Sequence, residues 1–298
     1  MTRFSRYQYF CALMFSGPLM IHPAYAQSTN AQAGQSRGQY PFSSDNMVMD
    51  ETFVVLGMGV ALRPDYEGAD EYKVSPAPLI RGRVAGFDFT TNGTGLSVDL
   101  IKDKPGQRVN FNLGPSASLR FGRNKKAEDP VIATLGARKT AFELGGSAGI
   151  SVNKVLHDHD SIKLAIDMNF DVSGIHDGVI FRPSLSYSTP LSRATYASLS
   201  LSASYADAGF MDTYFSVNLA DSIASGLPAY KANAGWKNAS VSLLIGHDLS
   251  GDARDGGWGL FTVASYSRLL EDARRSPIVA LRGSSDQFFA ATGVAYVF

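Results

Sequence analysis

The chain has almost no cysteine and no long apolar run, and each absence excludes a class of protein. Cys11 is the single cysteine among 298 residues, so disulfide scaffolds and thiolate metal sites are excluded. No segment approaches the run of about 18 apolar residues that a membrane-spanning helix needs. Lys plus Arg and Asp plus Glu number 27 each, and this balance argues against a nucleic-acid partner. The sequence also lacks a phosphate loop, a dinucleotide fingerprint and a zinc signature, so we expect no cofactor and no metal site.

The N-terminus has the features of a secretory signal peptide, predicted to span residues 1–26. Arg3 and Arg6 supply the basic region, a short apolar stretch follows, and Ala24-Tyr25-Ala26 matches an A-x-A cleavage site. Small polar residues dominate the next segment, 27–52. That composition predicts a flexible periplasmic tail that contributes nothing to a core.

From Phe53 onward, apolar residues recur at every second position. In the segment 162–173 all six even-numbered residues are apolar, whereas the odd-numbered residues are mostly polar. A strand places these two sets on opposite faces, whereas a helix would spread them around its circumference. A secreted β-sandwich has the same period, but these segments are about twice as long as typical soluble strands. The pattern therefore favours an all-β, transmembrane antiparallel barrel over residues 53–298.

Twelve segments carry the alternation, and an even number is typical of a single-chain bacterial barrel. They span 53–63, 73–83, 86–91, 94–102, 109–122, 141–153, 161–173, 178–189, 195–206, 237–248, 257–267 and 287–298. With twelve strands, the three long links all fall on one side, predicted to be extracellular: 123–140, 207–236 and 268–286. A thirteenth apolar stretch at 213–219 would break this parity, so we place it in a loop. Pro76 and Pro78 each remove a ladder donor, and we expect the second strand to bulge or pair poorly there.

The inward-facing set predicts a polar lumen. It comprises small residues together with Arg120, Glu143, Lys163, Asp167, Asn169, Asp171 and Arg182. Because both charge signs occur, the lumen is expected to be hydrated or partly plugged, with charges that pair with one another. A selective pore is the alternative reading.

The segment 157–160, His-Asp-His-Asp, is the densest polar cluster, and Ser161 follows it. Its position between two strands predicts a solvated turn on the periplasmic side. A metal-binding pair or part of a hydrolase site are the alternatives. No motif places a third group, so no catalytic residue is assigned and the chain is not expected to be an enzyme.

Four strings resemble sequences of the MipA/OmpV family. The string 57–68 resembles the family's first strand and Pro-x-Tyr-x-Gly-type turn, and 76–80 resembles its second strand. The string 225–232 resembles a Ser-Gly-Leu-x-x-Tyr loop, and 269–279 resembles a Leu-Leu-x-Asp-Ala-x-x-Ser-Pro-Ile-Val segment. The motif positions, whose role is unassigned, are Asp65, Tyr66, Glu67, Gly68, Ser225, Gly226, Leu227, Tyr230, Asp272, Ser276 and Pro277. Their structural reading is that Asp and Gly shape turns, while Tyr anchors a loop or belongs to the aromatic girdle at the membrane interface.

The resemblance implies a protein of the bacterial outer membrane. One family member is regarded as a non-enzymatic scaffold that joins a lytic transglycosylase to a murein-synthesising penicillin-binding protein. Porin-like and adhesin-like members are also known. Three hypotheses therefore remain open: a murein-enzyme scaffold, a small-solute channel, and an outer-membrane hydrolase.

The C-terminal strand carries a further signal. Phe298 lies in register with Tyr296 and Val294, and an aromatic residue ending such a strand resembles the assembly signal of outer-membrane barrels. We therefore expect outer-membrane lipid and the barrel-assembly machinery to be partners of the chain.

Overall fold

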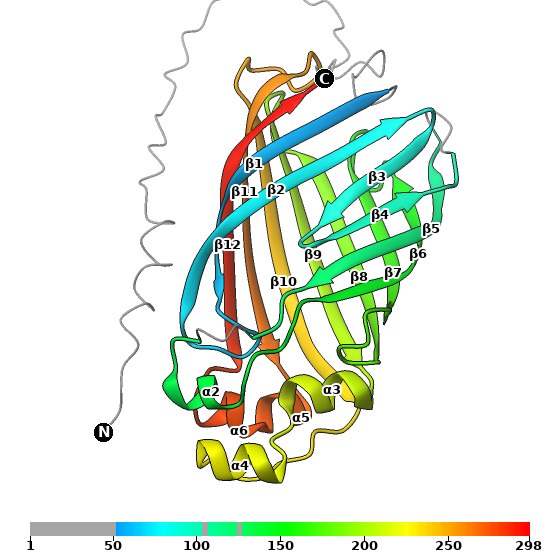
Figure 1. The fold of residues 1–298 in the computed structure, drawn as a ribbon. Helices are drawn as coiled ribbons and strands as arrows, with labels where there is room; N and C mark the ends of the chain where they lie inside the picture. The colour runs from blue at the N-terminus through cyan, green and yellow to red at the C-terminus, as the bar shows by residue number, and fades with distance from the viewer. Residues whose placement is uncertain (1–51, 103–106, 124–126) are drawn as a thin grey trace, which may run out of the picture. The chain divides into compact units, whose positions relative to one another are not determined.

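The computed structural model describes residues 52–102, 107–123 and 127–298. Twelve β-strands form one closed antiparallel barrel, in which β12 pairs with β1 (Figure 1). The strands are β1 (Phe53–Pro64), β2 (Tyr72–Val84), β3 (Phe87–Asn92), β4 (Gly95–Asp99), β5 (Val109–Arg120), β6 (Ala141–Asn153), β7 (Ser161–Asp171), β8 (Val179–Pro190), β9 (Thr195–Ala206), β10 (Gly235–Asp248), β11 (Gly257–Leu269) and β12 (Asp286–Val297). The prediction of a twelve-stranded barrel is confirmed, and no strand boundary differs from its predicted position by more than three residues. The predicted signal peptide and almost all of the predicted tail lie outside the described residues.

The outer surface of the barrel is an apolar belt. Along β1, Leu56, Met58 and Val60 are exposed, whereas Val55 is buried on the opposite face. Exposed aromatic side chains lie near both ends of the belt. Trp258 contacts Tyr296 at one end, and Tyr205 contacts Trp236 at the other. A closed barrel with an apolar belt between aromatic residues is suited to a lipid bilayer, and the protein is located in the bacterial outer membrane.

The connections between strands alternate between two ends of the barrel. The end that we call the loop end carries the helices (Figure 1). They are α2 (Pro130–Thr134), α3 (Ala208–Phe215), α4 (Leu219–Ser225), α5 (Glu271–Arg275) and α6 (Pro277–Ala280). The opposite end, the turn end, carries the shorter connections. The three long links therefore lie together, as the strand parity predicts. In the described ranges, no helix has the length and apolar character needed to span a membrane.

The helices inside the long links are a feature that the period-two analysis missed. The segment 213–219 is a loop element, as predicted, but it contains the end of α3 and the start of α4. The Asp207 side chain caps α3 and the Asn218 side chain caps α4, each accepting a main-chain N–H three residues later. Val217 lies between the two helices and forms only an isolated bridge with Tyr230.

Part of the lumen is apolar, which corrects the prediction of a uniformly small or polar inner face. Near the turn end, buried side chains of β1, β11 and β12 form one cluster, which we call the turn-end cluster. Its members are Phe53, Val55, Phe261 and Ala295. The inward positions of β5, β6, β7 and β8 keep the predicted polar character, because buried Glu143 and Asn169 lie on that side.

Ile166 and Asp167 are neighbours on β7 and test which face meets lipid. Ile166 belongs to the exposed belt, whereas Asp167 lines an internal cavity. We expect Ile166→Arg to lower the free energy of unfolding by about 2–4 kcal/mol, the cost of a cation on the lipid face near the midplane. Asp167→Asn should change it little. Urea titrations followed by tryptophan fluorescence measure both, and equal losses would contradict the assigned facing.

Candidate functional site

A packed cap lies across the loop end of the barrel (Figure 1). It is built from the segments 65–71, 127–140, 207–234 and 270–285, which contribute to two buried apolar clusters. The first cluster comprises Ile180, Ala206, Phe210, Met211, Phe215, Ala232, Leu269, Ala273 and Val279. The second comprises Tyr66, Ala69, Ala127, Ile132, Leu135, Val217, Leu227 and Ile278. Tyr230 packs against both clusters, so the cap is one continuous unit.

The cap brings together motif positions from three strings that are far apart in sequence. Tyr66 and Leu227 pack in the same cluster as Ile278. Pro277 precedes Ile278 and occupies the first turn of α6, where its missing N–H costs no hydrogen bond. These side chains therefore build the core of the cap.

Hydrogen bonds from other motif positions join the segments of the cap. The Tyr230 hydroxyl donates to the main-chain oxygen of Asp272 at 3.0 Å. One carboxylate oxygen of Asp272 accepts both the main-chain and the side-chain N–H of Asn233, each at 2.9 Å. The buried Ser276 hydroxyl donates to the main-chain oxygen of Phe215 at 2.6 Å. Each of these bonds links the connection 207–234 to the connection 270–285, so these residues hold the two segments of the cap together.

The remaining motif positions shape tight turns. Gly68 has φ of 97°, and a Cβ at this position would lie 2.6 Å from Cγ2 of Val279. Gly226 ends α4 in the left-handed conformation that favours glycine, and the preceding Ser225 hydroxyl donates back into that helix. Asp65 forms an ion pair with Lys73 at 2.6 Å.

Directly below the cap, a buried carboxylate connects three elements of the wall. Glu143 on β6 is 1% exposed. It accepts hydrogen bonds from Nε of Arg120 at 2.6 Å and from the Ser118 hydroxyl at 2.7 Å. Nε2 of His176, in the β7–β8 connection, lies 3.2 Å from the same carboxylate. The charge of Glu143 is therefore satisfied from β5 and from the loop end.

A second ion pair links the cap to the wall. Glu67 pairs with Lys237 on β10. Both cations lie over the aromatic ring of Phe210 on α3, with its centroid 4.8 Å from the Arg120 guanidinium carbon and 5.3 Å from the Lys237 ammonium nitrogen. Burial alone would raise the pKa of Glu67, but the charges of Lys237 and Arg120 outweigh it and lower that pKa below its ordinary value. The carboxylate is therefore ionised where it meets the two cations.

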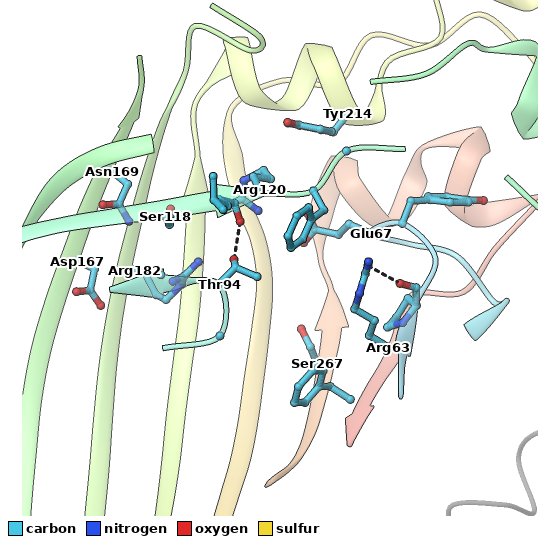
Figure 2. A pocket seen from close by; sticks show the side chains of 18 of the residues that line it. Arg63, Glu67, Thr94, Ser118, Arg120, Asp167, Asn169, Arg182, Tyr214 and Ser267 are labelled. Atoms are coloured by element: carbon cyan, nitrogen blue, oxygen red, sulfur yellow. Dashed lines mark hydrogen bonds between the residues drawn. The ribbon is translucent and has the colours of Figure 1, made fainter. Parts of the chain in front are cut away.

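A cavity of about 470 Å³ lies beside this network (Figure 2). Its charged lining consists of Arg63, Arg120, Arg123, Arg138, Arg182, Glu67 and Asp167. Its polar and aromatic lining includes Tyr66, Thr94, Ser118, Phe121, Asn169, Tyr214, Ser267 and Gln287. Five arginines face two carboxylates, so the cavity has an excess of positive charge.

Three of these arginines donate to neutral oxygens. Arg63 bonds the Ser75 hydroxyl, Arg182 bonds the Ser204 hydroxyl, and Arg123 bonds main-chain oxygens. Within residues 52–102, 107–123 and 127–298, none of the three forms an ion pair with a carboxylate. Burial and the neighbouring Arg138 lower the pKa of Arg123 to about 10. Its positive charge is therefore under-compensated in the cavity wall.

Two buried tyrosine hydroxyls at the cavity also lack a hydrogen-bond partner in the described part of the chain. They belong to Tyr66 and Tyr214. Burial raises the pKa of Tyr214 to about 12 and raises that of Tyr66 further above its ordinary value. Both phenols therefore stay protonated at neutral pH and retain an O–H donor.

Glu71 makes the cap sensitive to pH. Burial and the adjacent Asp70 raise its pKa to about 7 from 4.5, and Asp129 adds to the effect. The native state then holds a proton that the unfolded chain releases near pH 4.5, so stability falls as the pH rises from about 4.5 to 7. We expect Glu71→Gln to reduce this loss in urea titrations at pH 5 and pH 8. Parallel pH profiles for the two proteins would contradict the assignment.

The polar cluster at 157–160 forms a turn, as predicted, but it is not solvated throughout, because Asp160 is buried. His157 contacts the Thr189 hydroxyl at 2.9 Å. Asp160 accepts the main-chain N–H groups of Val155 and Leu156. Where the structure describes the chain, no group of three or more His, Cys, Asp or Glu side chains is arranged to hold a metal ion.

Sequence reasoning missed the parts of the site that depend on distant pairings. Glu67 and Lys237 are 170 residues apart, and Glu143 and His176 are 33 apart. Phe210 lies in a helix that the alternation does not reveal. No local signal identifies these partners, although the inward positions of Arg120 and Glu143 were predicted.

The assembly-signal residues lie at the closing seam of the barrel. Val294 and Tyr296 pair with Met58 and Leu56 on β1. Phe298 exchanges main-chain hydrogen bonds with Val54, at 2.9 and 3.4 Å. The role of these residues in assembly stays a prediction.

The chain matches one family model and is similar to several solved outer-membrane structures. The model of a family described as MltA-interacting protein MipA matches residues 56–298. Similar solved structures include a NanC porin (10% identity, 82% of this chain and 98% of that chain, TM-score 0.44). Others are an outer-membrane channel from Pseudomonas putida F1 (10%, 89% and 100%, 0.44) and the outer membrane protein OprD from Pseudomonas aeruginosa (8%, 85% and 95%, 0.33). No curated protein sequence matches the chain.

Proposed function

The chain belongs to the MipA family of MltA-interacting proteins, and on that premise we propose that it is a non-enzymatic scaffold of the outer membrane. Its partners are murein enzymes: a lytic transglycosylase of the MltA kind and a murein-synthesising penicillin-binding protein. The barrel anchors the complex in the membrane, and the surface that faces the periplasm binds the enzymes.

The observation that carries this proposal is the cap. A solute channel needs a continuous water-filled path along its axis, and a cap with two buried apolar clusters lies across the loop end. The turn-end cluster of Phe53, Val55, Phe261 and Ala295 fills part of the lumen at the other end. A barrel filled in this way is better suited to anchoring and docking than to conduction.

The turn end is the surface that periplasmic enzymes would meet. The parity of the strands predicts that the connections of the turn end face the periplasm. Leu156, in the turn between β6 and β7, is 76% exposed. Ile223 on α4, at the opposite end, is 78% exposed. The two residues form a matched pair of apolar side chains on opposite ends of the barrel.

Affinity capture of the tagged full chain from an envelope extract tests the proposal. We expect a lytic transglycosylase and a penicillin-binding protein to co-purify with the wild type and with Ile223→Asp. Leu156→Asp should reduce their recovery. If neither enzyme co-purifies with the wild type, or if Ile223→Asp has the larger effect, the scaffold proposal or its assigned surface is wrong.

A small-solute channel is the second candidate, and the arginine-lined cavity favours it. Five arginines line this cavity, and rings of Arg or Lys side chains line the pores that select anions. Planar-bilayer recordings distinguish the two functions. Stable unitary conductance together with failed enzyme capture would favour the channel, whereas captured enzymes without conductance would favour the scaffold.

A further inference from the structure

The barrel wall is incomplete on one side near the loop end. β2 pairs with β1 over its length, but its ladder with β3 covers only the four residues from Arg81 to Val84. In the part of the chain that the structure describes, no strand is paired with residues 74–79 on the β3 side. β2 and the β3–β4 hairpin diverge toward the loop end (Figure 1).

The two prolines of β2 lie on this open edge. The Thr91 hydroxyl on β3 accepts a hydrogen bond from the main-chain N–H of Ile80 and donates one to its main-chain oxygen. The main-chain groups of Ile80, and of every second residue from it along β2, therefore point away from β1. Val74, Pro76 and Pro78 share that parity, and the prolines have no N–H. An unpaired N–H in lipid costs several kcal/mol, so proline is favoured at an edge that stays open. The predicted poor pairing at the prolines is thus confined to one side of the strand, and no bulge forms on the other.

The lining of the cavity includes residues from both faces of the wall at this point. On the inside, its lining includes the lumen-facing Arg120 and Arg182. On the outside, it includes Leu96, Leu119 and Phe121, which are exposed at outward-facing positions of the belt. The same space is therefore bordered by apolar groups that face lipid and by cations that face the lumen.

The tip of the β3–β4 hairpin lies between the lumen-facing arginines and the exposed apolar residues of the cavity lining. Figure 2 shows the Arg182 side chain pointing toward Thr94, which lines the cavity at this tip. At the far edge, the Arg63 guanidinium carbon lies 5.5 Å from the centroid of the Phe121 ring. Cationic groups thus lie directly behind the apolar rim.

We propose that this part of the wall is a lateral opening through which the anionic headgroup of a lipid-like amphiphile enters the arginine-lined cavity. The acyl chain stays in the apolar belt beside Leu96 and Leu119. A phosphate or carboxylate headgroup accepts hydrogen bonds from Arg63, Arg123 and Arg182, which form no ion pair within the described residues, although Asp167 lies opposite Arg182 in the β7–β8 ladder. The hydroxyls of Tyr66 and Tyr214 supply neutral donors. Entry from the side suits this barrel because the cap lies across the axial route. This binding activity is separate from murein-enzyme docking.

Binding of a fluorescent lysophosphatidic acid to the purified full chain in a neutral detergent tests the proposal. We expect saturable binding, with Arg182→Gln weakening it about 10-fold through the loss of charge-assisted hydrogen bonds. Arg254→Gln, which removes a guanidinium at the turn end, should leave binding unchanged. Leu96→Trp should also weaken binding by filling the opening, whereas Phe111→Trp, at an exposed belt position outside the cavity lining, should not. Heat-modifiable gel mobility confirms that each variant is folded.

Four results would overturn the proposal. One is equal binding by Arg182→Gln and Arg254→Gln. Another is displacement of the probe by inorganic phosphate alone, because that would identify a free-anion site reached through the lumen. The third is a loss in Arg182→Gln with none in Leu96→Trp, because the headgroup would then not enter from the side. Equal binding of a monoacylglycerol with the same chain would equally rule out recognition of the anionic group.

Discussion

Replacing Glu143 with alanine is expected to destabilise the folded barrel by about 3–5 kcal/mol, the usual cost of removing one partner from a buried ion pair. The carboxylate is almost completely buried and binds Arg120, Ser118 and His176. Its removal leaves the Arg120 guanidinium beside Phe210 with no carboxylate at hydrogen-bonding distance among the described residues. The loss should exceed that of a surface ion pair, for which the median is about 0–1 kcal/mol.

A double-mutant cycle separates the buried charge from simple loss of packing. Glu143→Leu together with Arg120→Met removes both charges and keeps apolar volume, so the double variant should be more stable than either single variant. Arg254→Met is the matched control, since it breaks the half-buried pair with Asp252 near the surface. Urea titrations followed by the fluorescence of the two tryptophans measure each variant. Additive losses in the cycle would mean that the two side chains act independently.

The strands were predictable because each one carries its own signal. In β7, Leu164, Ile166 and Met168 meet lipid while Asp167 and Asn169 face the cavity, and this alternation is local in the sequence. The bilayer imposes it on every strand, so the predicted number and parity of strands agree with the structure.

The cap could not be derived in the same way, because its helices are short and its contacts are distant. α5 has five residues and α6 has four, too few for a helical period to appear in a sequence. The partners of Tyr230 and Ser276 are chosen by how four connections fold against one another. Many residues of the family strings lie in the cap, and only the packing there assigns them a structural role.

Pro76 and Pro78 show how a correct local argument can lead to an incomplete conclusion. Each proline does remove a ladder donor, as the sequence analysis states. The missing main-chain N–H groups lie on the side of β2 that faces β3, beyond the end of the β2–β3 ladder. On the other side of β2, pairing with β1 is continuous. The length of the neighbouring hairpin decides this outcome, and no property of the β2 sequence reports it.

Phe298→Ala is expected to lower the amount of barrel in the outer membrane several-fold while changing its intrinsic stability little. The side chain is 63% exposed at the lipid surface and contacts Tyr296 edge to face. One such aromatic contributes at most ~3 kcal/mol of burial energy. Before closure, however, β12 is an unpaired edge that strand-pairing machinery can recognise, and Phe298 ends the aromatic file on that edge.

Trp258→Ala provides the control for this last prediction. Trp258 on β11 is 58% exposed. Its ring contacts that of Tyr296 on β12, with 5.1 Å between the ring centroids. Its truncation removes a comparable lipid-facing aromatic from the same end of the belt without altering the closing strand. Envelope fractionation and heat-modifiable gel mobility report assembly, and refolding titrations in detergent report stability. If Phe298 carries an assembly signal, only Phe298→Ala should lower the amount of assembled barrel without lowering its stability. A general loss of interfacial aromatic area would instead affect both variants alike.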